Sequence, residues 1–347
     1  MLPAEWFSNI WIAILLFIVG VVLIIKGGDW FVDAATWIAE KSGIPKFIIG
    51  ATIVSLATTL PELIVSVLAA IEGHGYLVAG NLDLANNSVD MAIGNAIGSV
   101  NANIGLIMAI SLIFMPSSVD KKKFFWKPIL LFTTVTLLFI VCLSGELKTW
   151  GAIIVLLMLV AFVAENLISA KQGDEEITPV EIVEEEKEKA ADSKGNVFAN
   201  IVKFIVGAFF IVLGAELLID SGESIAITLN VPTKIIALTI VAVGTSLPEL
   251  VTTITAIVKK QSDLSVGNII GANVIDMALI LPVCSLVFGG SLPVANNVLY
   301  IDFTFGILFV LVAILPGMIK GKNYRLQGIA LLLIYITYLV LSSVINL

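Results

Sequence analysis

Two short segments of this 347-residue chain repeat almost the same residues in the middle of long apolar stretches. One reads Ala57-Thr58-Thr59-Leu60-Pro61-Glu62-Leu63 and the other reads Gly244-Thr245-Ser246-Leu247-Pro248-Glu249-Leu250. A proline within a helix removes one hydrogen bond and frees the carbonyl four residues earlier, and the adjacent hydroxyls add neutral oxygens. The glutamates add charge where an unpaired carboxylate costs at least ~2.5 kcal/mol. Each segment is therefore predicted to hold a cation.

These residue types also have ordinary structural roles. A buried glutamate can be protonated or paired with a lysine, and a helical hydroxyl commonly bonds back to the carbonyl four residues earlier. Because Glu62 and Glu249 repeat in the same context, we favour the binding role for both. The neighbouring hydroxyls are expected to be ligands too, namely those of Thr58, Thr59, Thr245 and Ser246.

A second pair of similar segments follows, from Gly94 to Asn103 and from Gly267 to Asp276. Polar residues recur in them every four or eight positions, which places them close to one helix face. These residues are Asn95, Ser99 and Asn103 in the first segment and Asn268 and Asp276 in the second. Each segment also contains a GxxxG pair, which predicts close helix packing that would bring the two polar faces together.

The candidate ligands are all hard oxygens. Carboxylates come from Glu62, Glu249 and Asp276, an amide comes from Asn103, and hydroxyls and freed carbonyls add to them. This supply suits the 6–8 oxygen ligands of Ca²⁺ better than Mg²⁺, which sheds water reluctantly. His74 is the only histidine, so a site of several histidines is excluded. Copper or zinc is not expected, because no soft ligand is present.

The elements that must position these residues are membrane helices. The chain is 59% hydrophobic and 13% charged, with a mean hydropathy of +1.06, which is far from the composition of a soluble domain. A spanning helix needs roughly 20 mostly apolar residues. Ten such stretches occur, near residues 10–38, 45–71, 88–115, 126–144, 149–169, 197–222, 232–258, 264–288, 296–317 and 325–345. They predict an all-α polytopic membrane protein with ten transmembrane helices.

The two halves of the chain repeat each other. A shift of 187 residues places Gly20 on Gly207, Gly27 on Gly214 and Glu62 on Glu249. Five helices per repeat is an odd number, so the second copy must insert upside down, as in transporters with inverted repeats. We expect a first inverted repeat at 1–169, an acidic cytoplasmic linker at 170–196 and a second inverted repeat at 197–347.

Basic residues divide unequally between alternate loops. One side receives only Lys148 and Lys234, and Lys26 is set aside as intramembrane. The other side collects Lys41, Lys46, Lys121, Lys122, Lys123, Lys127, Lys171, Lys187, Lys189, Lys194, Lys203, Lys259, Lys260, Lys320, Lys322 and Arg325. The positive-inside rule then predicts a multi-pass protein of the cell (plasma) membrane, with both termini outside and the central loop cytoplasmic.

With these motifs the sequence resembles the cation/calcium exchanger superfamily, and most closely its sodium/calcium exchanger family of the prokaryotic type. That family carries paired repeats with G-T-S-L-P-E-L followed by G-N-x-x-G-S-N-x-x-(N/D), and Gly244 to Asp276 matches almost completely. The resemblance implies a central ion cluster of four residues, Glu62, Asn103, Glu249 and Asp276. It also implies flanking monovalent sites completed by Thr58, Thr59, Ser99, Thr245 and Ser246.

The chain departs from the family pattern in three places. Ala57-Thr58-Thr59 replaces G-T-S, and Ala272 stands where the family usually has a hydroxyl, which could weaken one sodium site. The first repeat also has 14 extra residues between its ligands, because Glu62 to Asn103 spans 41 positions and Glu249 to Asp276 spans 27. We expect these residues, around Gly73 to Asn87, to form a surface loop on the outer side. His74, Asn81 and Asp83 in that loop could alternatively screen entering ions.

The predicted function is secondary active antiport of Ca²⁺ against Na⁺, by alternating access at a carboxylate site near the bilayer midplane. A Ca²⁺/H⁺ antiporter is the alternative, because a buried carboxylate can also be driven by protons. A cation channel is a further alternative, which the inverted repeats disfavour. The chain is not expected to be an enzyme or to need a cofactor, and its expected partners are Ca²⁺ and Na⁺ ions and the lipid bilayer, with no nucleic acid. The oligomeric state is left open.

Overall fold

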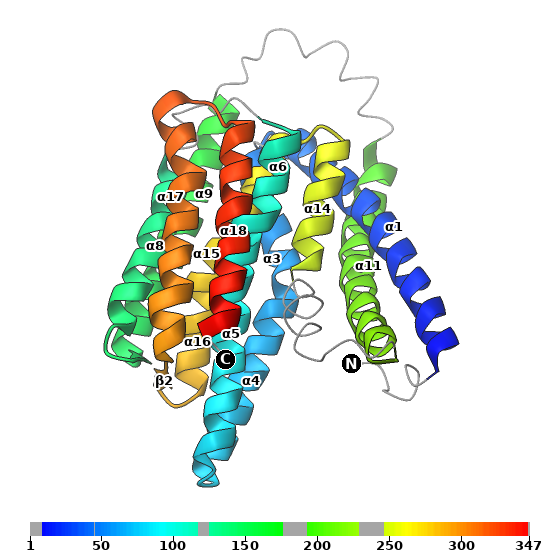
Figure 1. Ribbon diagram of the computed structural model, residues 1–347. Helices are drawn as coiled ribbons and strands as arrows, with labels where there is room; N and C mark the ends of the chain where they lie inside the picture. The colour runs from blue at the N-terminus through cyan, green and yellow to red at the C-terminus, as the bar shows by residue number, and fades with distance from the viewer. Residues whose placement is uncertain (1–8, 45, 117–124, 176–192, 229–245, 346–347) are drawn as a thin grey trace.

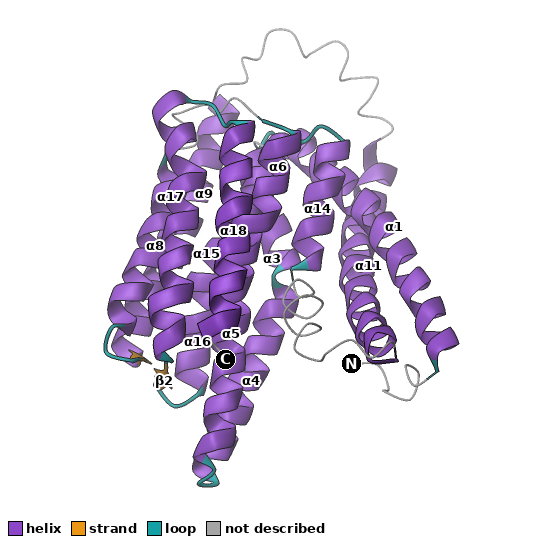
Figure 2. Cartoon of the chain, in the orientation of Figure 1, coloured by secondary structure: helices purple, strands orange, loops and turns teal. Residues whose placement is uncertain are grey.

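The described part of the chain folds into a bundle of helices with one short pair of strands (Figures 1 and 2). The computed structural model describes residues 9–44, 46–116, 125–175, 193–228 and 246–345. The elements of the first half are α1 (Ile10–Ser42), α2 (Lys46–Ile49), η2 (Gly50–Val54), α3 (Ser55–Thr58), α4 (Leu60–Val78), α5 (Leu82–Ala102), η3 (Asn103–Met108), α6 (Ala109–Phe114), α8 (Trp126–Cys142), β1 (Glu146–Lys148) and α9 (Thr149–Glu175). Elements named η are π-helical turns.

The second half of the chain is also helical. Its elements are α11 (Ser193–Thr228), α14 (Leu247–Val258), α15 (Ser262–Ile275), η5 (Asp276–Ile280), α16 (Leu281–Val287), β2 (Ser291–Pro293), η6 (Val298–Asp302), α17 (Phe303–Lys320) and α18 (Arg325–Ile345). The predicted linker at 170–196 is described only at its two ends, where it continues α9 and begins α11.

Eight helices in the described part of the chain are long and apolar enough to cross a membrane. Two shorter apolar helices, Trp126–Cys142 and Leu247–Val258, lie in the other two stretches that the sequence marks as spans. Large apolar side chains such as Leu15, Leu157 and Leu333 are exposed on the outside of the bundle. Exposed apolar side chains on the outer surface are what a lipid-facing helix bundle requires.

The helices that carry the second pair of motifs lie at the centre of the molecule. The continuous runs Leu82–Phe114 and Asp263–Val287 are the most buried of the candidate spans. Small residues allow them to approach closely, and Ala92, Ala96 and Ala278 are fully buried. The main apolar core therefore surrounds the helices that are predicted to bear ligands.

α1 and α11 form a closely packed antiparallel pair beside this core (Figure 1). A Cβ added at Gly20 would lie 2.9 Å from the Gly214 carbonyl oxygen, and one at Gly27 would lie 2.8 Å from that of Gly207. Only glycine allows backbones to approach this closely. The 187-residue shift maps one of these contacts onto the other, since Gly20 corresponds to Gly207 and Gly27 to Gly214.

The 14 extra residues of the first half do not form the surface loop that we expected. They lengthen two helices, since α4 has 19 residues against 12 in α14, and α5 has 21 against 14 in α15. Each helix gains seven residues, which is about two turns and ~10 Å. The hairpin of α4 and α5 consequently projects beyond the rest of the bundle (Figure 1). Apolar residues from Leu68 to Val78 continue the helical pattern, and Asn81 caps α5 by accepting a bond from the Leu84 N–H at 3.3 Å.

The two GxxxG pairs behave differently. Gly271 packs as predicted, because a Cβ there would clash with the Ala51 backbone and would lie 2.5 Å from the Ser55 Oγ. At Gly94 and Gly98 no atom of the described residues comes within 4 Å of an added Cβ, so close packing there stays a prediction. Close packing at the motif thus joins α15 to the segment that precedes the first glutamate.

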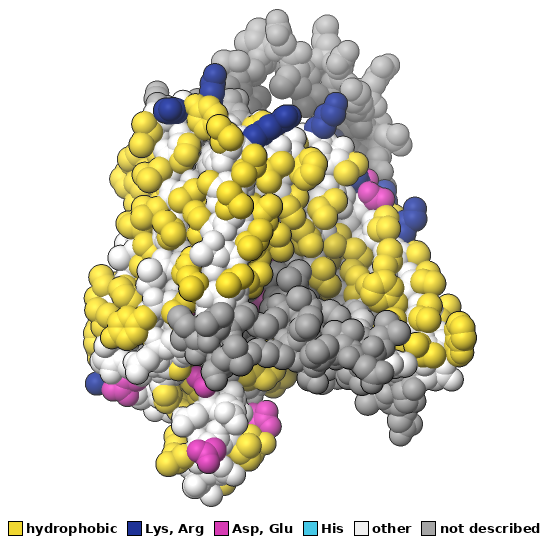
Figure 3. Space-filling view, viewed as in Figure 1, with side chains coloured by type: hydrophobic (Ala, Val, Ile, Leu, Met, Phe, Trp, Pro, Cys, Tyr) yellow, Lys and Arg dark blue, Asp and Glu magenta, His cyan; other side chains and the backbone are white. Residues whose placement is uncertain are grey.

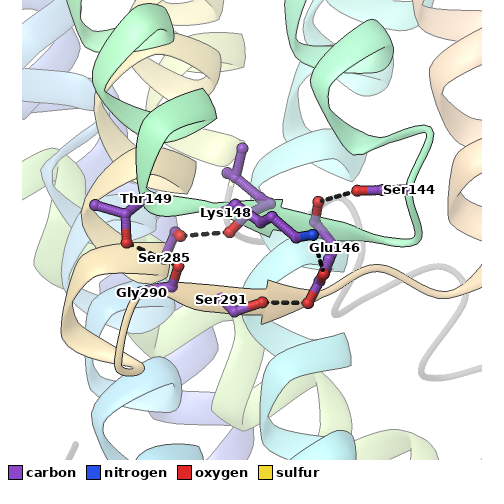
Figure 4. A network of polar contacts seen from close by, with 8 residues as sticks. Ser144, Glu146, Lys148, Thr149, Ser285, Gly290 and Ser291 are labelled. Atoms are coloured by element: carbon purple, nitrogen blue, oxygen red, sulfur yellow. Dashed lines mark hydrogen bonds and ion pairs between the residues drawn. The ribbon is translucent and has the colours of Figure 1, made fainter.

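A short strap, made of strands β1 and β2, links the two halves of the chain (Figure 4). Strand β1 pairs antiparallel with β2, with Leu147 opposite Leu292. The Ser285 hydroxyl donates to the Leu147 carbonyl at 2.6 Å, and the Ser291 hydroxyl donates to the Glu146 carboxylate. Hydrogen bonds from Lys148 and Ser291 hold the pKa of Glu146 below its usual range. These bonds favour the charged carboxylate, so the strap is strongest above the ordinary pKa of a glutamate and weakens as the pH falls through the lowered value.

Most Lys and Arg side chains visible in Figure 3 lie toward the end of the bundle where α17 ends and α18 begins. Lys148 belongs to the strap at the opposite end. Lys127, which the sequence placed on the basic side, is buried in the first turn of α8 with its Nζ 3.5 Å from a Glu165 carboxylate oxygen.

Candidate functional site

Both glutamates lie in the first turn of a helix that begins in the middle of the molecule. α3 ends before Thr59, whose φ and ψ are −86° and 1°, and α4 begins at Leu60. Ser246 has nearly the same backbone angles, −87° and 9°, and α14 begins directly after it. The N-terminus of a helix carries partial positive charge and favours a nearby carboxylate. The proline motifs therefore place Glu62 and Glu249 at equivalent helix starts.

The spacing of these residues would also fit a capping box, in which a Ser or Thr at the N-cap and a Glu three residues later bond to each other's backbone. Neither N-cap side chain makes such a bond. No carboxylate oxygen of Glu62 or Glu249 makes a hydrogen bond of ordinary geometry to a described residue, and both residues are fully buried. Capping does not explain these two acids.

Asn103 and Asp276 occupy equivalent irregularities. Each begins a π-helical turn, Asn103–Met108 in η3 and Asp276–Ile280 in η5. The backbone N–H of each approaches the carbonyls three and four residues earlier in the same way. π-Helical turns are rare and occur frequently at functional sites. Asn103 Oδ1 and both Asp276 carboxylate oxygens are buried and make no hydrogen bond of ordinary geometry to a described residue.

Seven buried acceptor oxygens are thus unpaired on four residues from the two halves of the chain. Electrostatic repulsion acts between Glu62 and both other carboxylates, and between Glu249 and Asp276. None of these three acids forms an ion pair with a basic side chain of the described residues. Unpaired buried carboxylates that repel one another are stabilised by a bound cation.

The described part of the chain contains no group of three His, Cys, Asp or Glu side chains already gathered as metal ligands. A cation at this place would therefore need the Asn103 amide and neighbouring hydroxyls in addition to carboxylates. Such mixed oxygen sets are common for Ca²⁺.

Hydroxyls of the two motifs meet across the two halves. The Ser99 and Ser246 Oγ atoms are 3.1 Å apart, and the Asn103 amide donates to Ser99 at 3.3 Å. The Ser99 hydroxyl also faces Asp276, and the Thr58 hydroxyl faces Glu249. Ser99 thereby connects Asn103, Ser246 and Asp276.

Thr58 and Thr59 both bond to the Ser55 carbonyl, at 3.3 and 2.6 Å. This is the ordinary helical role of a hydroxyl, and it uses the hydroxyl proton while leaving oxygen lone pairs for a cation. Both threonines are buried. Thr245, the remaining hydroxyl that the sequence singles out, lies outside the described residues, as does Gly244.

Sequence reasoning placed Asn95 and Asn268 on the polar faces but gave them no role. Asn268 is buried, donates to Thr252 at 3.1 Å and accepts from Thr58 at 3.4 Å. Asn95 donates to Ser66 at 2.9 Å and to the Glu62 carbonyl at 3.2 Å. The two asparagines therefore orient the segments that carry Thr58 and Glu62. Their matched positions in the repeated motifs were the sequence signal for this role.

The sequence was compared with protein families and known relatives. The model of the family described as "Sodium/calcium exchanger protein" matches twice, at residues 12–167 and 199–344. An uncharacterized membrane protein of Methanocaldococcus jannaschii is 33% identical over 92% of this chain and 94% of its own length. A protein named sodium/calcium exchanger MaX1, from Methanosarcina acetivorans, is 26% identical over 94% of this chain and 97% of its own length.

The fold has solved counterparts as well. A structure of the sodium-calcium exchanger NCX_Mj soaked with Na⁺ and Sr²⁺ superimposes with a TM-score of 0.75. It is 29% identical, and the match covers 94% of this chain and 97% of that one. The resemblance therefore extends over the whole bundle, including both motif pairs.

Proposed function

Because the chain belongs to the sodium/calcium exchanger family, and is therefore a multi-pass membrane protein that exchanges cations, we propose that it carries Ca²⁺ in one direction and Na⁺ in the other through one buried site. We assign the central ligands to Glu62, Asn103, Glu249 and Asp276. Flanking oxygens come from Thr58, Thr59, Ser99, Thr245 and Ser246.

The observation that carries this proposal is the set of seven unpaired buried oxygens on those four central residues. Every one of them is an acceptor. A buried acid that served only to hold helices together would be paired with a donor or a basic side chain. A set made only of acceptors calls for a cation, and the number of oxygens suits Ca²⁺.

Exchange follows from the charge of this set. Three carboxylates can be neutralised by one divalent ion or by several monovalent ions, but mutual repulsion between cations opposes binding of both kinds together. Ca²⁺ then leaves only when Na⁺ replaces it. The cluster of hydroxyls from Thr58, Ser99 and Ser246 favours Na⁺ as the second ion, because neutral oxygens suit a monovalent cation.

A Ca²⁺/H⁺ antiporter is the second candidate, and one observation favours it. Ala272 is fully buried at the position that corresponds to Ser99, so one hydroxyl of the symmetric set is missing. Protons could neutralise the same carboxylates without needing that oxygen.

We further propose that ten helices cross the membrane as two inverted repeats, at 1–169 and 197–347, with the site near the bilayer midplane. Support comes from the two matches to one family model and from the reciprocal contacts of Gly20 with Gly214 and of Gly27 with Gly207. In a two-fold arrangement residue i contacts j and j contacts i. The matched helix starts at Leu60 and Leu247 add to this support.

The orientation that we propose is a plasma-membrane protein with both termini outside and the linker at 170–196 in the cytoplasm. Transport in this scheme needs no bound cofactor and no enzymatic step. An impermeant thiol reagent applied to intact cells should label Leu347→Cys and not Ser193→Cys. The reverse pattern would invert the topology.

Flux into liposomes that contain the purified protein tests the exchange itself. An outward Na⁺ gradient should drive uptake of radiolabelled Ca²⁺, whereas a proton gradient alone should not. Uptake that follows the pH gradient and ignores Na⁺ would establish the proton-coupled alternative. Discrete single-channel currents in a planar bilayer, without countertransport, would instead indicate a channel.

A further inference from the structure

A groove of about 500 Å³ opens between the end of α17 and the beginning of α18. Its walls are mainly apolar and include Val312, Leu315, Pro316 and Leu326, while Lys320 and Tyr324 stand at its rim. Leu315 and Leu326 are 43% and 77% exposed, so the groove opens onto the lipid-facing surface. Neither the exchange site nor its motifs contribute to it.

Pro316 lines the groove and interrupts the backbone hydrogen bonding of α17. Proline has no N–H, so the Val312 carbonyl four residues earlier loses its helical partner. The Gln327 amide from α18 replaces it, donating to the Val312 carbonyl at 3.1 Å and to the Ala313 carbonyl at 2.6 Å. The Gln327 oxygen accepts from the Tyr324 N–H at 3.2 Å. The backbone groups at the kink are therefore satisfied within the protein, and the groove can take an apolar chain without exposing an unpaired polar group.

Basic residues gather in sequence where α17 ends and α18 begins, and of these Lys320 lines the groove. Lys320 lies with its Nζ 5.7 Å from the centre of the Tyr324 ring, and Lys322 and Arg325 follow within five residues. All three basic side chains are exposed. The chain contains no Asp or Glu after Asp302, so no acid near in sequence opposes this charge. Tyr324 is 39% exposed, and aromatic residues of this kind are enriched at the level of lipid headgroups.

An apolar groove with a basic rim fits one class of molecule. We propose that the groove between α17 and α18 binds an anionic phospholipid, with the phosphate at Lys320 and Arg325 and an acyl chain along Leu315 and Leu326. A free phosphate would leave the apolar walls unused. A zwitterionic lipid carries no net charge to match the three basic residues. Basic pockets between helices on the cytoplasmic side of membrane proteins bind lipid headgroups by the same physics.

Native mass spectrometry of the detergent-solubilised protein tests the proposal. Phosphatidylglycerol and phosphatidylcholine with the same acyl chains are titrated separately. Lys320→Gln with Arg325→Gln should weaken phosphatidylglycerol binding by roughly 30-fold, because each basic residue near a charged lipid contributes on the order of a fivefold effect. Binding of phosphatidylcholine should not change. Leu315→Trp fills the groove while keeping every charge, and it should weaken phosphatidylglycerol binding independently.

The matched control is Lys41→Gln. Lys41 is an exposed basic residue in the last turn of α1, and it does not line the groove. Its loss should leave phosphatidylglycerol binding as in the wild type, and excess inorganic phosphate should not displace the lipid. The proposal is overturned if the double variant binds phosphatidylglycerol as the wild type does, or if Lys41→Gln reduces binding equally. Displacement by inorganic phosphate would show an anion site and not a lipid site.

Discussion

The hairpins α4–α5 and α14–α15 differ most at their tips and least at their inner ends. At the inner ends, Thr59 and Ser246 share one backbone geometry, and Asn103 and Asp276 each begin a π-helical turn. The tips differ by seven residues in each helix. Seven residues are about two turns, so both helices lengthen with little rotation of their faces. The extra residues therefore lengthen the outer ends of α4 and α5 without changing the positions of the proposed ligands at their inner ends.

The turns at the two tips are also alike. Ala79-Gly80-Asn81 and Lys259-Lys260-Gln261 make the same series of backbone bonds to the residues four, three and five positions earlier. The middle residue has a positive φ in both, +79° at Gly80 and +57° at Lys260. Only length and side-chain chemistry therefore distinguish the two hairpins. Each such difference can be tested by exchanging residues between them.

The largest effect is expected at the ligand pair Asn103 and Asp276. Asp276→Asn removes one of three carboxylates from a buried site and should weaken the apparent Ca²⁺ affinity by at least ~100-fold, because losing one partner of a buried charge costs about 3–5 kcal/mol. Adding Asn103→Asp to that variant moves the charge to the equivalent position. Transport should then return to within about tenfold of the wild type, as measured by Ca²⁺ uptake into liposomes.

Asn95→Asp in the Asp276→Asn background is the control for total charge. It places a carboxylate on α5 at a residue that bonds to Ser66. If it restored uptake as well as Asn103→Asp does, total charge would matter and not the position of the ligand.

A second difference concerns the link to α1. Lys259 at the end of α14 lies 2.8 Å from an Asp33 carboxylate oxygen and 3.4 Å from one of Asp29, and it ties α1 to the second hairpin. The 187-residue shift places Glu72 at the corresponding position of the first hairpin, so charge of the opposite sign occurs there. Lys259→Gln should shift the equilibrium between packed and separated α1 and α14 by about fivefold toward separation. The reason is that a partly exposed ion pair contributes up to ~1 kcal/mol.

Disulfide formation between Gly28→Cys and Thr255→Cys measures that contact, because a Cβ at Gly28 would lie 2.8 Å from the Thr255 hydroxyl. The native thiols Cys142 and Cys284 are buried and should be replaced by alanine. Cross-linking should slow in Lys259→Gln and keep its rate in Lys260→Gln. Equal rates in all backgrounds would remove any role for the ion pair.

The third difference is the missing hydroxyl at Ala272. Ala272→Ser should lower the Na⁺ concentration that gives half-maximal exchange by about fivefold, because a hydrogen-bonding or ligating hydroxyl contributes about 1 kcal/mol. The Ca²⁺ dependence should change little, since Ca²⁺ relies chiefly on the carboxylates. Ala278→Ser, at another buried alanine of the same run, is the control. An equal shift for both ions would argue against a sodium role for this position.

The smallest effect is expected at the two tips. Lys260 holds a positive φ that favours glycine, so Lys260→Gly should stabilise the protein by roughly 1 kcal/mol. Gly80→Lys should destabilise it by a similar amount. Thermal unfolding in detergent measures both, with exchange activity as the check on folding. A shift of the same sign in both variants would contradict the account that backbone conformation controls the stability of these turns.

The helices and the irregular backbone at the repeated motifs could be predicted from the sequence, for physical reasons. Long apolar stretches predicted the helical bundle, and the Pro61 and Pro248 motifs predicted irregular backbone where α4 and α14 begin. Both features depend on local hydropathy and on the missing proline N–H, which can be read along the chain.

Other features depended on contacts that spacing alone does not reveal. The segment from Gly73 to Asn87 looked like a loop because it is an insertion with polar residues, yet two whole turns in each helix preserve its packing. The bridge from Ser99 to Ser246 joins positions 147 residues apart, and only the fold places them together.

Calcium binding to the two glutamates is the central claim. Glu62→Gln and Glu249→Gln each remove one full charge from the proposed site while keeping the shape of the side chain, and each residue is fully buried with both carboxylate oxygens unpaired. The most direct measurement is Na⁺-driven uptake of radiolabelled Ca²⁺ by liposomes containing each variant, at matched amounts of folded protein. The account predicts that both variants lose uptake. Wild-type flux in either variant would contradict it and would show that glutamate to be structural.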